Sequence, residues 1–412
     1  MSLDKTPRGE RIHIGIFGRR NSGKSSLINA VTGQDIALVS DAPGTTTDPV
    51  LKAMELPPAG PVVFMDTAGF DDEGDLGSLR VRKTEDILQR TDIGIIVIEG
   101  SRMKKGGSEL SCEIKWLDMM KSRDVPVIIA VSKWDGGEDA AGMEAAKSNA
   151  KEAFGSLPAV FTSAFGKTGL EELREAVAGV ADDMEEGEGL LGSMVKEGSL
   201  VLLVMPQDIQ APKGRLILPQ AQTLRELLDK RAVAVSTGAE NFSNALSSLC
   251  REPDLIITDS QCFDTVWQSK PEGVPLTSFS ILFAAYKGDA PILAKGALAL
   301  DDMTEKSRIL IAEACTHPPL SEDVGTVKIP ALLRERLGEN IKIVHVRGGD
   351  FPKDEELSGF DMVIHCGACM FNRKHVMNRI YAAARAGVPI TNYGMILAKI
   401  SGILDRVEIP GL

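Results

Sequence analysis

The 412-residue sequence has no apolar run near the roughly 18 residues needed to span a bilayer, and no charged-then-apolar leader opens it. It also lacks a basic excess, because its formal net charge at pH 7 is -12. Sequence-independent binding to nucleic acid or to an acidic membrane requires a basic face, so this charge argues against both kinds of partner. With 43% hydrophobic and 25% charged residues, the composition is typical of a globular protein, and we expect a cytoplasmic one.

Cysteine is scarce, with six residues in the whole sequence. This excludes the dense disulfide framework of a small secreted protein. Cys112, Cys250 and Cys262 are scattered along the chain, and we predict that each is a buried small hydrophobic residue rather than a ligand. The other three cysteines lie among histidines near the C-terminal end of the sequence.

Strand-like and helix-like segments alternate from residue 11 to residue 180, which is typical of a parallel sheet with helices on both faces. The expected strands are Ile12–Phe17, Val62–Met65, Ile93–Ile98, Val127–Val131 and Ala159–Thr162. The acidic, glycine-containing stretch 181–192 is predicted to start at the end of a helix and to continue as a linker.

Alternation resumes after the linker, and we find neither an internal repeat nor a low-complexity tract. Further strands are expected at Leu200–Met205, Ala232–Ser236, Leu255–Thr258, Ser307–Ala312, Ile341–Val346 and Asp361–Ile364. We therefore predict an α/β fold with a first domain over residues 1–184. Two smaller α/β domains with mainly parallel sheets are expected over 185–272 and 273–412.

A phosphate loop follows the first expected strand. The segment Gly18–Ser25 fits G-x-x-x-x-G-K-[ST] and opens a helix, which is the context that this motif requires. Its glycines allow backbone amides to form an anion-binding nest at the positive end of the helix. Lys24 is expected to reach the β- and γ-phosphates, and the Ser25 hydroxyl is expected to ligate Mg²⁺. The predicted phosphate-binding residues are Gly18, Asn21, Ser22, Gly23, Lys24, Ser25 and Ser26.

Three further elements lie at the carboxyl ends of strands, where open α/β sheets bind ligands. The carboxylate of Asp66, in Asp66–Gly69, is expected to reach Mg²⁺ through water, and the Gly69 amide to sense a γ-phosphate. Ser132–Asp135 ends another strand, and the Asp135 carboxylate matches the two adjacent donors of guanine, which adenine lacks. Ser163 and Ala164 supply an amide for guanine O6. Ser132, Lys133, Asp135, Ser163 and Ala164 are therefore predicted to bind the base, and the first domain is predicted to be a P-loop GTPase domain.

At these residues the domain resembles the GTPases of the Era/TrmE branch, through the strings GRRNSGKSSLIN, GTTTD and DTAGF. The resemblance implies that Thr46 ligates Mg²⁺, with Thr45 and Thr47 as alternatives, and that Asn21 helps to hold K⁺. It implies a catalytic set of Lys24, Thr46, Asp66 and Gly69.

Two departures from that branch affect the expected activity. Ser132 stands where an asparagine normally braces the nucleotide loops, so we expect weaker affinity for the base. Phe70 follows DTAG where Ras-type proteins carry a water-orienting glutamine, so we expect slow hydrolysis without a partner or K⁺.

The last expected domain contains Cys315-Thr316-His317 and, after 47 residues, His365-Cys366-Gly367-Ala368-Cys369. Both groups follow expected strands, and adjacent parallel strands would bring the three sulfurs to one edge of a sheet. Three thiolates suit an iron–sulfur cluster with one iron left for another ligand. They equally suit a zinc site with three cysteines and either His317 or His365. Three buried structural cysteines are the remaining alternative.

The combination of motifs resembles the HydF family, the maturation GTPases of the iron-only (FeFe) hydrogenases, through ACTH, EDVGTVKIP and HCGACMFNR. The resemblance covers essentially the whole chain. It implies GTP-binding, dimerisation and cluster-binding domains in that order, with Cys315, Cys366 and Cys369 holding a 4Fe–4S cluster. His317 and His365 would be either the exchangeable fourth ligand or hydrogen-bond donors beside the ligands.

The resemblance also implies a scaffold or carrier for the di-iron subcluster that is delivered to apo FeFe hydrogenase, with radical-SAM maturases as further partners. GTP, Mg²⁺, K⁺ and the cluster are the expected cofactors, and a homodimer is the expected assembly. Two alternatives remain: an Era/TrmE-like GTPase acting on RNA, which the net charge of -12 disfavours, and a zinc-stapled GTPase interaction protein.

Overall fold

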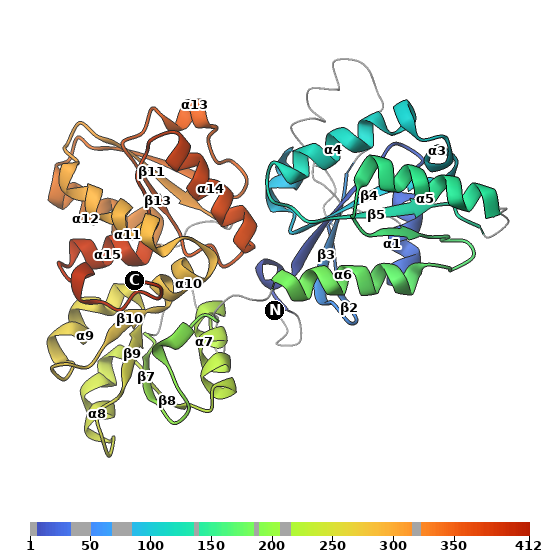
Figure 1. Cartoon of the computed structure of the whole chain (residues 1–412). Helices are drawn as coiled ribbons and strands as arrows, with labels where there is room; N and C mark the ends of the chain where they lie inside the picture. The colour runs from blue at the N-terminus through green and yellow to red at the C-terminus, as the bar shows by residue number, and fades with distance from the viewer. Residues whose placement is uncertain are drawn as a thin grey trace, which may run out of the picture. The chain divides into compact units, whose positions relative to one another are not determined.

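The computed structural model describes residues 6–33, 51–67, 85–135, 140–184, 189–206, 216–314 and 323–412. The chain divides into two compact units, Met1–Gly187 and Glu188–Leu412. Figure 1 shows their elements coloured along the chain, with the first unit in blue to green and the second in green to red.

The described part of the first unit forms a six-stranded sheet in the order β2-β3-β1-β4-β5-β6. Its strands are β1 (Ile12–Phe17), β2 (Leu51–Leu56), β3 (Gly60–Asp66), β4 (Ile93–Glu99), β5 (Val127–Ser132) and β6 (Ala159–Phe161). β2 pairs antiparallel with β3, and the other pairings are parallel. The five strands predicted in this unit are confirmed within one or two residues. β2 was not predicted, because its half-exposed LKAMEL sequence has no continuous apolar run.

Helices cover both faces of this sheet. They are α1 (Lys24–Thr32), α3 (Gly100–Lys105), α4 (Ser111–Lys121), α5 (Ala140–Phe154) and α6 (Leu170–Met184), with 3-10 helices η1 (Arg8–Glu10) and η2 (Gly107–Leu110) and a helical segment at 85–90. α3, α4 and α5 pack on one face, and α1 and α6 pack on the other. Alternate side chains of β4 and β5 enter the two cores, so these strands are apolar throughout.

The described part of the second unit contains two four-stranded sheets, in the orders β10-β9-β7-β8 and β12-β11-β13-β14, with parallel pairing throughout. The first comprises β7 (Leu200–Val204), β8 (Val233–Thr237), β9 (Leu255–Thr258) and β10 (Leu276–Ser278). The second comprises β11 (Arg308–Glu313), β12 (Lys342–Arg347), β13 (Met362–His365) and β14 (Ile390–Asn392). The predicted α/β class with mainly parallel sheets is confirmed. β10 and β14 are three-residue strands that were not predicted.

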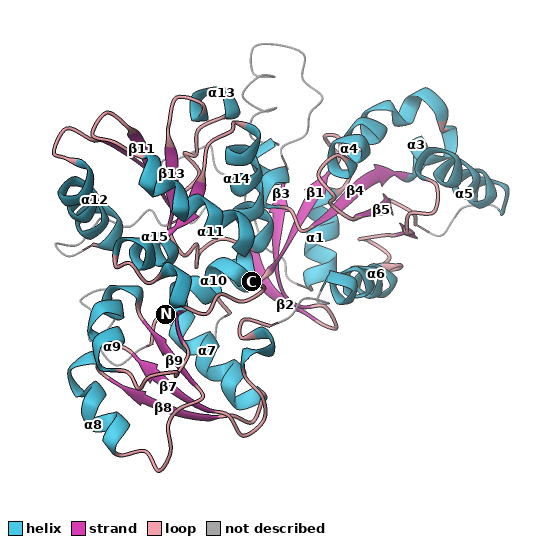
Figure 2. Ribbon diagram, turned by 60° about the vertical axis from the view of Figure 1, so that its left-hand side comes forward, coloured by secondary structure: helices cyan, strands magenta, loops and turns pink. Residues whose placement is uncertain are grey.

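Helices enclose both sheets. Around the first sheet lie η3 (Gly192–Met194), α7 (Leu218–Asp229), η4 (Ala239–Asn241), α8 (Phe242–Ser247), η5 (Ser260–Cys262) and α9 (Phe263–Ser269). The remaining elements are α10 (Phe279–Lys287), α11 (Ala290–Leu298), η6 (Ala299–Asp302), a π-helix η7 (Val324–Lys328), α12 (Ile329–Leu337), α13 (Asp354–Leu357), α14 (Arg373–Arg385), α15 (Tyr393–Ile400) and η8 (Leu404–Arg406). Figure 2 shows α7 on one face of the first sheet and α8 and α9 on the other.

One continuous apolar core runs through both sheets of the second unit. It joins Leu202 and Leu276 of the first sheet to Leu310 and Val363 of the second. β10 lies beyond residue 272 and pairs with β9, so the sheet extends past the boundary that we predicted there. The division of the chain at residues 184 and 272 remains a prediction about its domains.

Candidate functional site

The phosphate loop connects β1 to α1 as its sequence pattern predicts. Asn21 and Gly23 adopt the left-handed conformation, with φ of 61° and 92°. Such φ values turn successive backbone amides toward the inside of the loop, which is the geometry of an anion nest. Gly18 passes so close to β4 that a Cβ atom there would lie 2.7 Å from the carbonyl oxygen of Val97. The loop therefore requires glycine at position 18.

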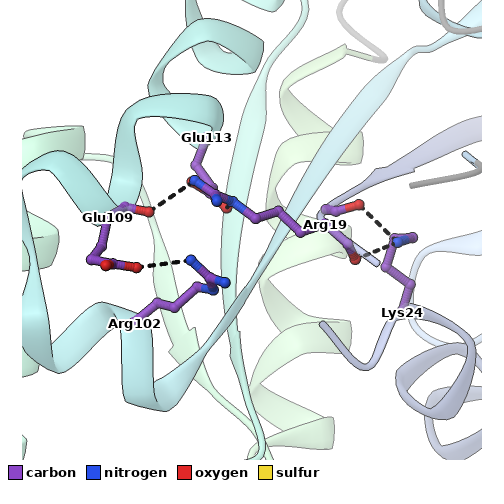
Figure 3. A network of polar contacts seen from close by, with 6 residues as sticks. Arg19, Lys24, Arg102, Glu109 and Glu113 are labelled. Carbon is purple, nitrogen blue, oxygen red and sulfur yellow. Dashed lines mark hydrogen bonds and ion pairs between the residues drawn. The ribbon is translucent and has the colours of Figure 1, made fainter. Parts of the chain in front are cut away.

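Lys24 begins α1 and is buried. Its Nζ donates to the carbonyl oxygens of Gly18 at 2.7 Å and Arg19 at 2.8 Å (Figure 3). These two bonds fix the ammonium group over the loop, where a phosphate bound in the nest would meet its charge.

Asp66 ends β3 beside this loop. The Ser25 hydroxyl donates to its Oδ2 at 3.3 Å, while its Oδ1 and the hydroxyl of Ser22 are buried without a hydrogen-bond partner among the described residues. Burial raises the pKa of the Asp66 carboxyl, and this outweighs the opposing effects of Lys24 and the bond from Ser25. A hard cation such as Mg²⁺ prefers oxygen ligands, so the oxygens of Ser25 and Asp66 suit it.

The side chain of Arg19 links the phosphate loop to a different part of the unit. Its Nε donates to Glu113 of α4 at 2.9 Å, and its Nη2 donates to the Glu109 carbonyl oxygen at 3.0 Å. The Glu113 side chain is only 1% exposed. Figure 3 shows this network continuing from Glu109 to Arg102. We did not predict it, because Arg19 and Glu113 are 94 positions apart in sequence.

Four of the residues predicted to bind the base, Ser132, Lys133, Asp135 and Ala164, line a cavity of about 850 Å³ beside α1. Asp135 accepts a hydrogen bond from the Ser163 hydroxyl at 2.5 Å, and that hydroxyl accepts from the Gly166 amide at 2.8 Å. A further bond, from the Trp134 amide to the Thr162 carbonyl oxygen at 3.0 Å, holds the two base-binding loops together.

Ser132 connects the predicted base-binding side of the cavity to the phosphate loop, as the asparagine of related GTPases is expected to do. Its hydroxyl donates to the carbonyl oxygen of Ser22 at 2.5 Å. The smaller side chain therefore still braces the loop, although its hydroxyl has one proton where an asparagine amide has two.

Phe165 also lines the cavity and was not predicted. Its side chain is 93% exposed, which is unusual for so large an apolar group. Phe165 directly follows Ser163 and Ala164, which were predicted to bind the base. This position was the one signal in the sequence that could have indicated its place at the cavity.

Several predicted nucleotide and metal residues lie outside the described residues. They are Thr45, Thr46, Thr47, Gly69, Phe70, Cys315 and His317.

The strands that precede the two cysteine groups are neighbours, as expected. β11 and β13 pair in parallel, with Ala312 opposite His365. Cys366 comes directly after β13, where its amide donates to the Ala312 carbonyl oxygen at 2.9 Å. Its sulfur accepts from the amides of Ala314 at 3.1 Å and Ala368 at 3.4 Å. These donors stabilise negative charge on the sulfur.

Burial raises the pKa of the Cys366 thiol to about 11. A thiolate there needs a cationic partner, which a metal ion or cluster iron supplies. Among the described residues no group of three or more His, Cys, Asp and Glu side chains is placed to hold a metal.

His365 has both ring nitrogens engaged. Nδ1 lies 2.8 Å from the Cys366 carbonyl oxygen, and Nε2 lies 3.0 Å from Nη1 of Arg379. Arg379 has only donors, so Nε2 accepts and Nδ1 carries the proton. Burial and the nearby guanidinium lower the pKa of His365 to about 3. Of the two roles that we predicted, the hydrogen-bonding role fits this geometry, and a fourth ligand at His365 would require these bonds to break.

The scattered cysteines give a mixed outcome. Cys112 and Cys262 are half-buried against apolar cores. Cys250 is exposed, so the prediction that it is buried is wrong. Cys250 follows α8 in an exposed polar turn. The scattered position of a cysteine in the sequence does not show whether its side chain is buried.

Within the described residues, no helix is both long enough and apolar enough to cross a membrane.

Three protein-family models match the chain. The model described as 50S ribosome-binding GTPase matches residues 13–133. The hydrogen maturase F dimerization domain matches residues 190–288, and the hydrogen maturase F tetramerization domain matches residues 291–409. The GTPase interpretation of the first domain is thereby confirmed.

Curated relatives match part of the chain. GTPase Der of Kosmotoga olearia is 32% identical over 209 residues, covering 48% of this chain and 46% of that protein. GTPase Der of Campylobacter concisus is 38% identical over 130 residues, covering 31% and 27%. This chain thus spans less than half the length of these relatives. Among solved structures, Aquifex aeolicus Era bound to GDP and aluminium fluoride is 19% identical with a TM-score of 0.35, covering 62% of this chain and 97% of that one.

Proposed function

This chain belongs to the hydrogen maturase F family, and we propose that it is a GTP-hydrolysing scaffold for FeFe-hydrogenase maturation. In this proposal it binds a 4Fe–4S cluster and assembles or delivers the di-iron subcluster to the apo-hydrogenase. The observation that carries the proposal is that one chain combines a phosphate loop with a cysteine loop, residues 366–369. The cysteine loop follows β13, which pairs with β11, the strand that leads to Cys315. Radical-SAM maturases are the proposed suppliers of the precursor.

We assign the steps of GTP hydrolysis to residues of the first unit. Lys24 would neutralise phosphate charge, and Ser25 and Thr46 would ligate Mg²⁺, which Asp66 would reach through water. Bound Mg²⁺ offsets the negative charge that builds up on the phosphates. Gly69 donates its amide to the γ-phosphate, and Asn21 helps to hold K⁺.

A turnover assay tests this part of the proposal. We expect GTP to be hydrolysed slowly, in preference to ATP, and faster in K⁺ than in Na⁺. Lys24→Ala should abolish turnover, because it removes the charge that stabilises the transferring phosphoryl group. Equal rates with ATP and GTP would refute the role of Asp135 in base choice. Equal rates in K⁺ and Na⁺ would separately refute the role of Asn21.

Cys315, Cys366 and Cys369 are the proposed ligands of the cluster. Two features support this set: the pairing of β11 with β13, and the two amides that donate to the Cys366 sulfur. Three thiolates leave one iron with a replaceable ligand, and a cluster that receives a precursor needs such an open position. His317 remains a proposed fourth ligand or hydrogen-bond donor, and His365 a donor beside the site.

Anaerobic reconstitution followed by metal analysis, visible absorption and EPR tests the cluster. Cys366→Ser should remove most of the iron and the broad visible absorption while GTP binding is retained, because the nucleotide site belongs to the other compact unit. Cys250→Ser is the matched control, since that thiol is exposed and apart from the motif. Stoichiometric zinc without iron would favour the zinc-stapled alternative. Tight RNA binding that falls steeply with salt would favour the RNA-directed one.

The family matches also bear on assembly. The dimerization and tetramerization domains that match the second unit support oligomerisation of this chain. We propose a homodimer formed through residues of about 195–270 as the minimal assembly.

A further inference from the structure

A buried arginine stands beside the cysteine loop. Arg379 lies on α14 and is only 3% exposed. Its guanidinium carbon lies 4.5 Å from the ring centre of Phe371 and 4.8 Å from that of Phe351. Its Nη2 donates to the Gly348 carbonyl oxygen, and its Nη1 donates to Nε2 of His365. The cation is thus held in a fixed position by two aromatic rings and two acceptors.

A short chain of hydrogen bonds connects Arg379 to Cys366. The guanidinium fixes the His365 ring through Nε2, and the Nδ1 proton of the same ring points to the Cys366 carbonyl oxygen. The side chain of Arg379 therefore determines both the tautomer and the orientation of the histidine next to the cysteine loop. A neutral apolar residue of similar length would fill the same space without the cost of burying a charge.

The positive charge of Arg379 changes the relative electrostatic stability of the charge states of any group bound at Cys366. A fixed positive charge in a buried environment stabilises the more negative of two states nearby. For a cluster held by thiolates, that is the reduced state, so a nearby cation raises the reduction potential.

We propose that Arg379 is the positioning and charge-setting residue of the cysteine centre: its guanidinium orients the His365–Cys366 turn, and its positive charge raises the reduction potential of a cluster bound there. This inference rests on the proposed function, since it requires that Cys366 is a cluster ligand. It adds to that function a residue outside both cysteine motifs.

A potentiometric titration of the reconstituted full-length protein, followed by EPR, tests the proposal. The variants are Arg379→Met, which removes the charge, Arg379→Gln, which removes it but keeps two N–H donors, and Arg379→Lys, which keeps it. Arg385→Met is the matched control, because Arg385 lies on the same helix but is exposed and pairs with Asp354 at 2.9 Å. Iron content per chain and near-UV circular dichroism are measured on every sample.

We expect the Met and Gln variants to shift the midpoint potential to more negative values than the wild type. Arg379→Lys and Arg385→Met should stay close to the wild-type potential. A purely structural role would change melting temperature and iron content, but it would leave the potential of the retained cluster unchanged.

Three results would overturn the inference or its premise, and they are distinguishable. A wild-type protein that gains no cluster refutes the proposed function. A wild-type cluster with an unchanged potential in Arg379→Gln or Arg379→Met refutes the role of Arg379 alone. Should both neutral variants fail to fold, Arg379→Lys still decides, because a large negative shift there would show that the positive charge is not the determinant.

Discussion

Asp66 illustrates a conflict between function and stability at a single residue. Its carboxyl is buried next to the phosphate loop, with one oxygen lacking a hydrogen-bond partner among the described residues. Because burial raises its pKa, the neutral form is favoured in the folded protein relative to the unfolded chain. The stability contributed by this group is therefore present at low pH and is lost as pH rises through the folded-state pKa. At neutral pH an ionised Asp66 destabilises the nucleotide-free protein.

Asp66→Asn should separate these two effects. We expect the free energy of unfolding of the first unit to rise by about 1 kcal/mol at neutral pH, which corresponds to a melting temperature about 2–4 °C higher. Mg²⁺-dependent GTP turnover should be lost. Calorimetry without nucleotide and a phosphate-release assay measure the two quantities. The stabilisation should shrink on acidification, and a variant that is less stable than the wild type at neutral pH would contradict the argument.

Phe165 is the second residue with a functional interpretation of its own. An exposed ring at the mouth of a cavity predicted to bind guanine offers a face on which a base can stack. Stacking of a base on an aromatic side chain contributes about 1–3 kcal/mol. Phe165→Ala should therefore weaken GTP and GDP binding by roughly tenfold, while Phe165→Trp retains it.

Titration calorimetry with GTP, GDP and ITP checks this prediction. Stacking contacts the face of the base and makes no hydrogen bond to its edge. Phe165→Ala should therefore weaken the binding of all three nucleotides by a similar factor. Unchanged affinity in Phe165→Ala would show that the ring serves another purpose.

At the scale of elements, the phosphate loop is held by α4 and η2 as well as by β1 and α1. The ion pair between Arg19 and Glu113 connects these elements, and the carbonyl oxygen of Arg19 is one of the two that position Lys24. Removing one partner of a buried pair leaves an uncompensated charge. The orientation of Lys24 therefore depends on a glutamate that has no direct place in the chemistry.

Arg19→Ala and Glu113→Gln should each lower kcat for GTP by roughly 10- to 100-fold, because small displacements of a catalytic group have effects of this size. The double variant should be no slower than the worse single variant, since both remove the same link. Arg102→Ala is the control, because it pairs with the half-exposed carboxylate of Glu109, whereas Arg19 contacts Glu109 through the backbone carbonyl oxygen. Additive losses, or loss of melting temperature with unchanged kcat, would indicate that the pair only stabilises the fold.

At the scale of the whole molecule, we expect assembly to use an open edge of one of the two smaller sheets. β8 pairs with β7 on one side and with no other strand in the described chain, and the Val233 side chain on it is 53% exposed. An unpaired strand edge presents backbone donors and acceptors to a second copy. This edge lies within the matched dimerization domain. Deleting the matched domain, residues 190–288, is a poor test, because this range includes α10, which packs against α14 and α15, and its loss would expose their core.

Val233→Lys is a cleaner perturbation. A charge at the edge should weaken strand pairing between copies and lower the mass measured by analytical ultracentrifugation, with GTP binding unchanged. Met184→Lys is the control, since Met184 is an exposed apolar residue of the first unit. An unaltered mass in Val233→Lys would place the interface on another surface.

Local signals in the sequence were sufficient for the five mutually parallel strands of the first unit and for the phosphate loop, but not for the antiparallel strand β2. β1 was predicted at its observed bounds, because a six-residue segment in which five residues are apolar or small directly precedes a glycine-rich loop and a helix. The short strands β10 and β14 were missed, since each has only three residues and is followed directly by a helix, so no turn marks where the strand ends.

The sequence by itself determined which residues are chemically able to bind phosphate, base and metal, because those abilities depend on residue type and on spacing within one loop. Only the tertiary structure decided which distant groups support them. Ser132 reaches Ser22 across 110 positions, and Glu113 reaches Arg19 across 94. Within the second unit, Arg379 lies 14 positions after the histidine that it orients. Such contacts depend on how helices and strands pack, and packing is set by the whole buried core rather than by the residues that meet there.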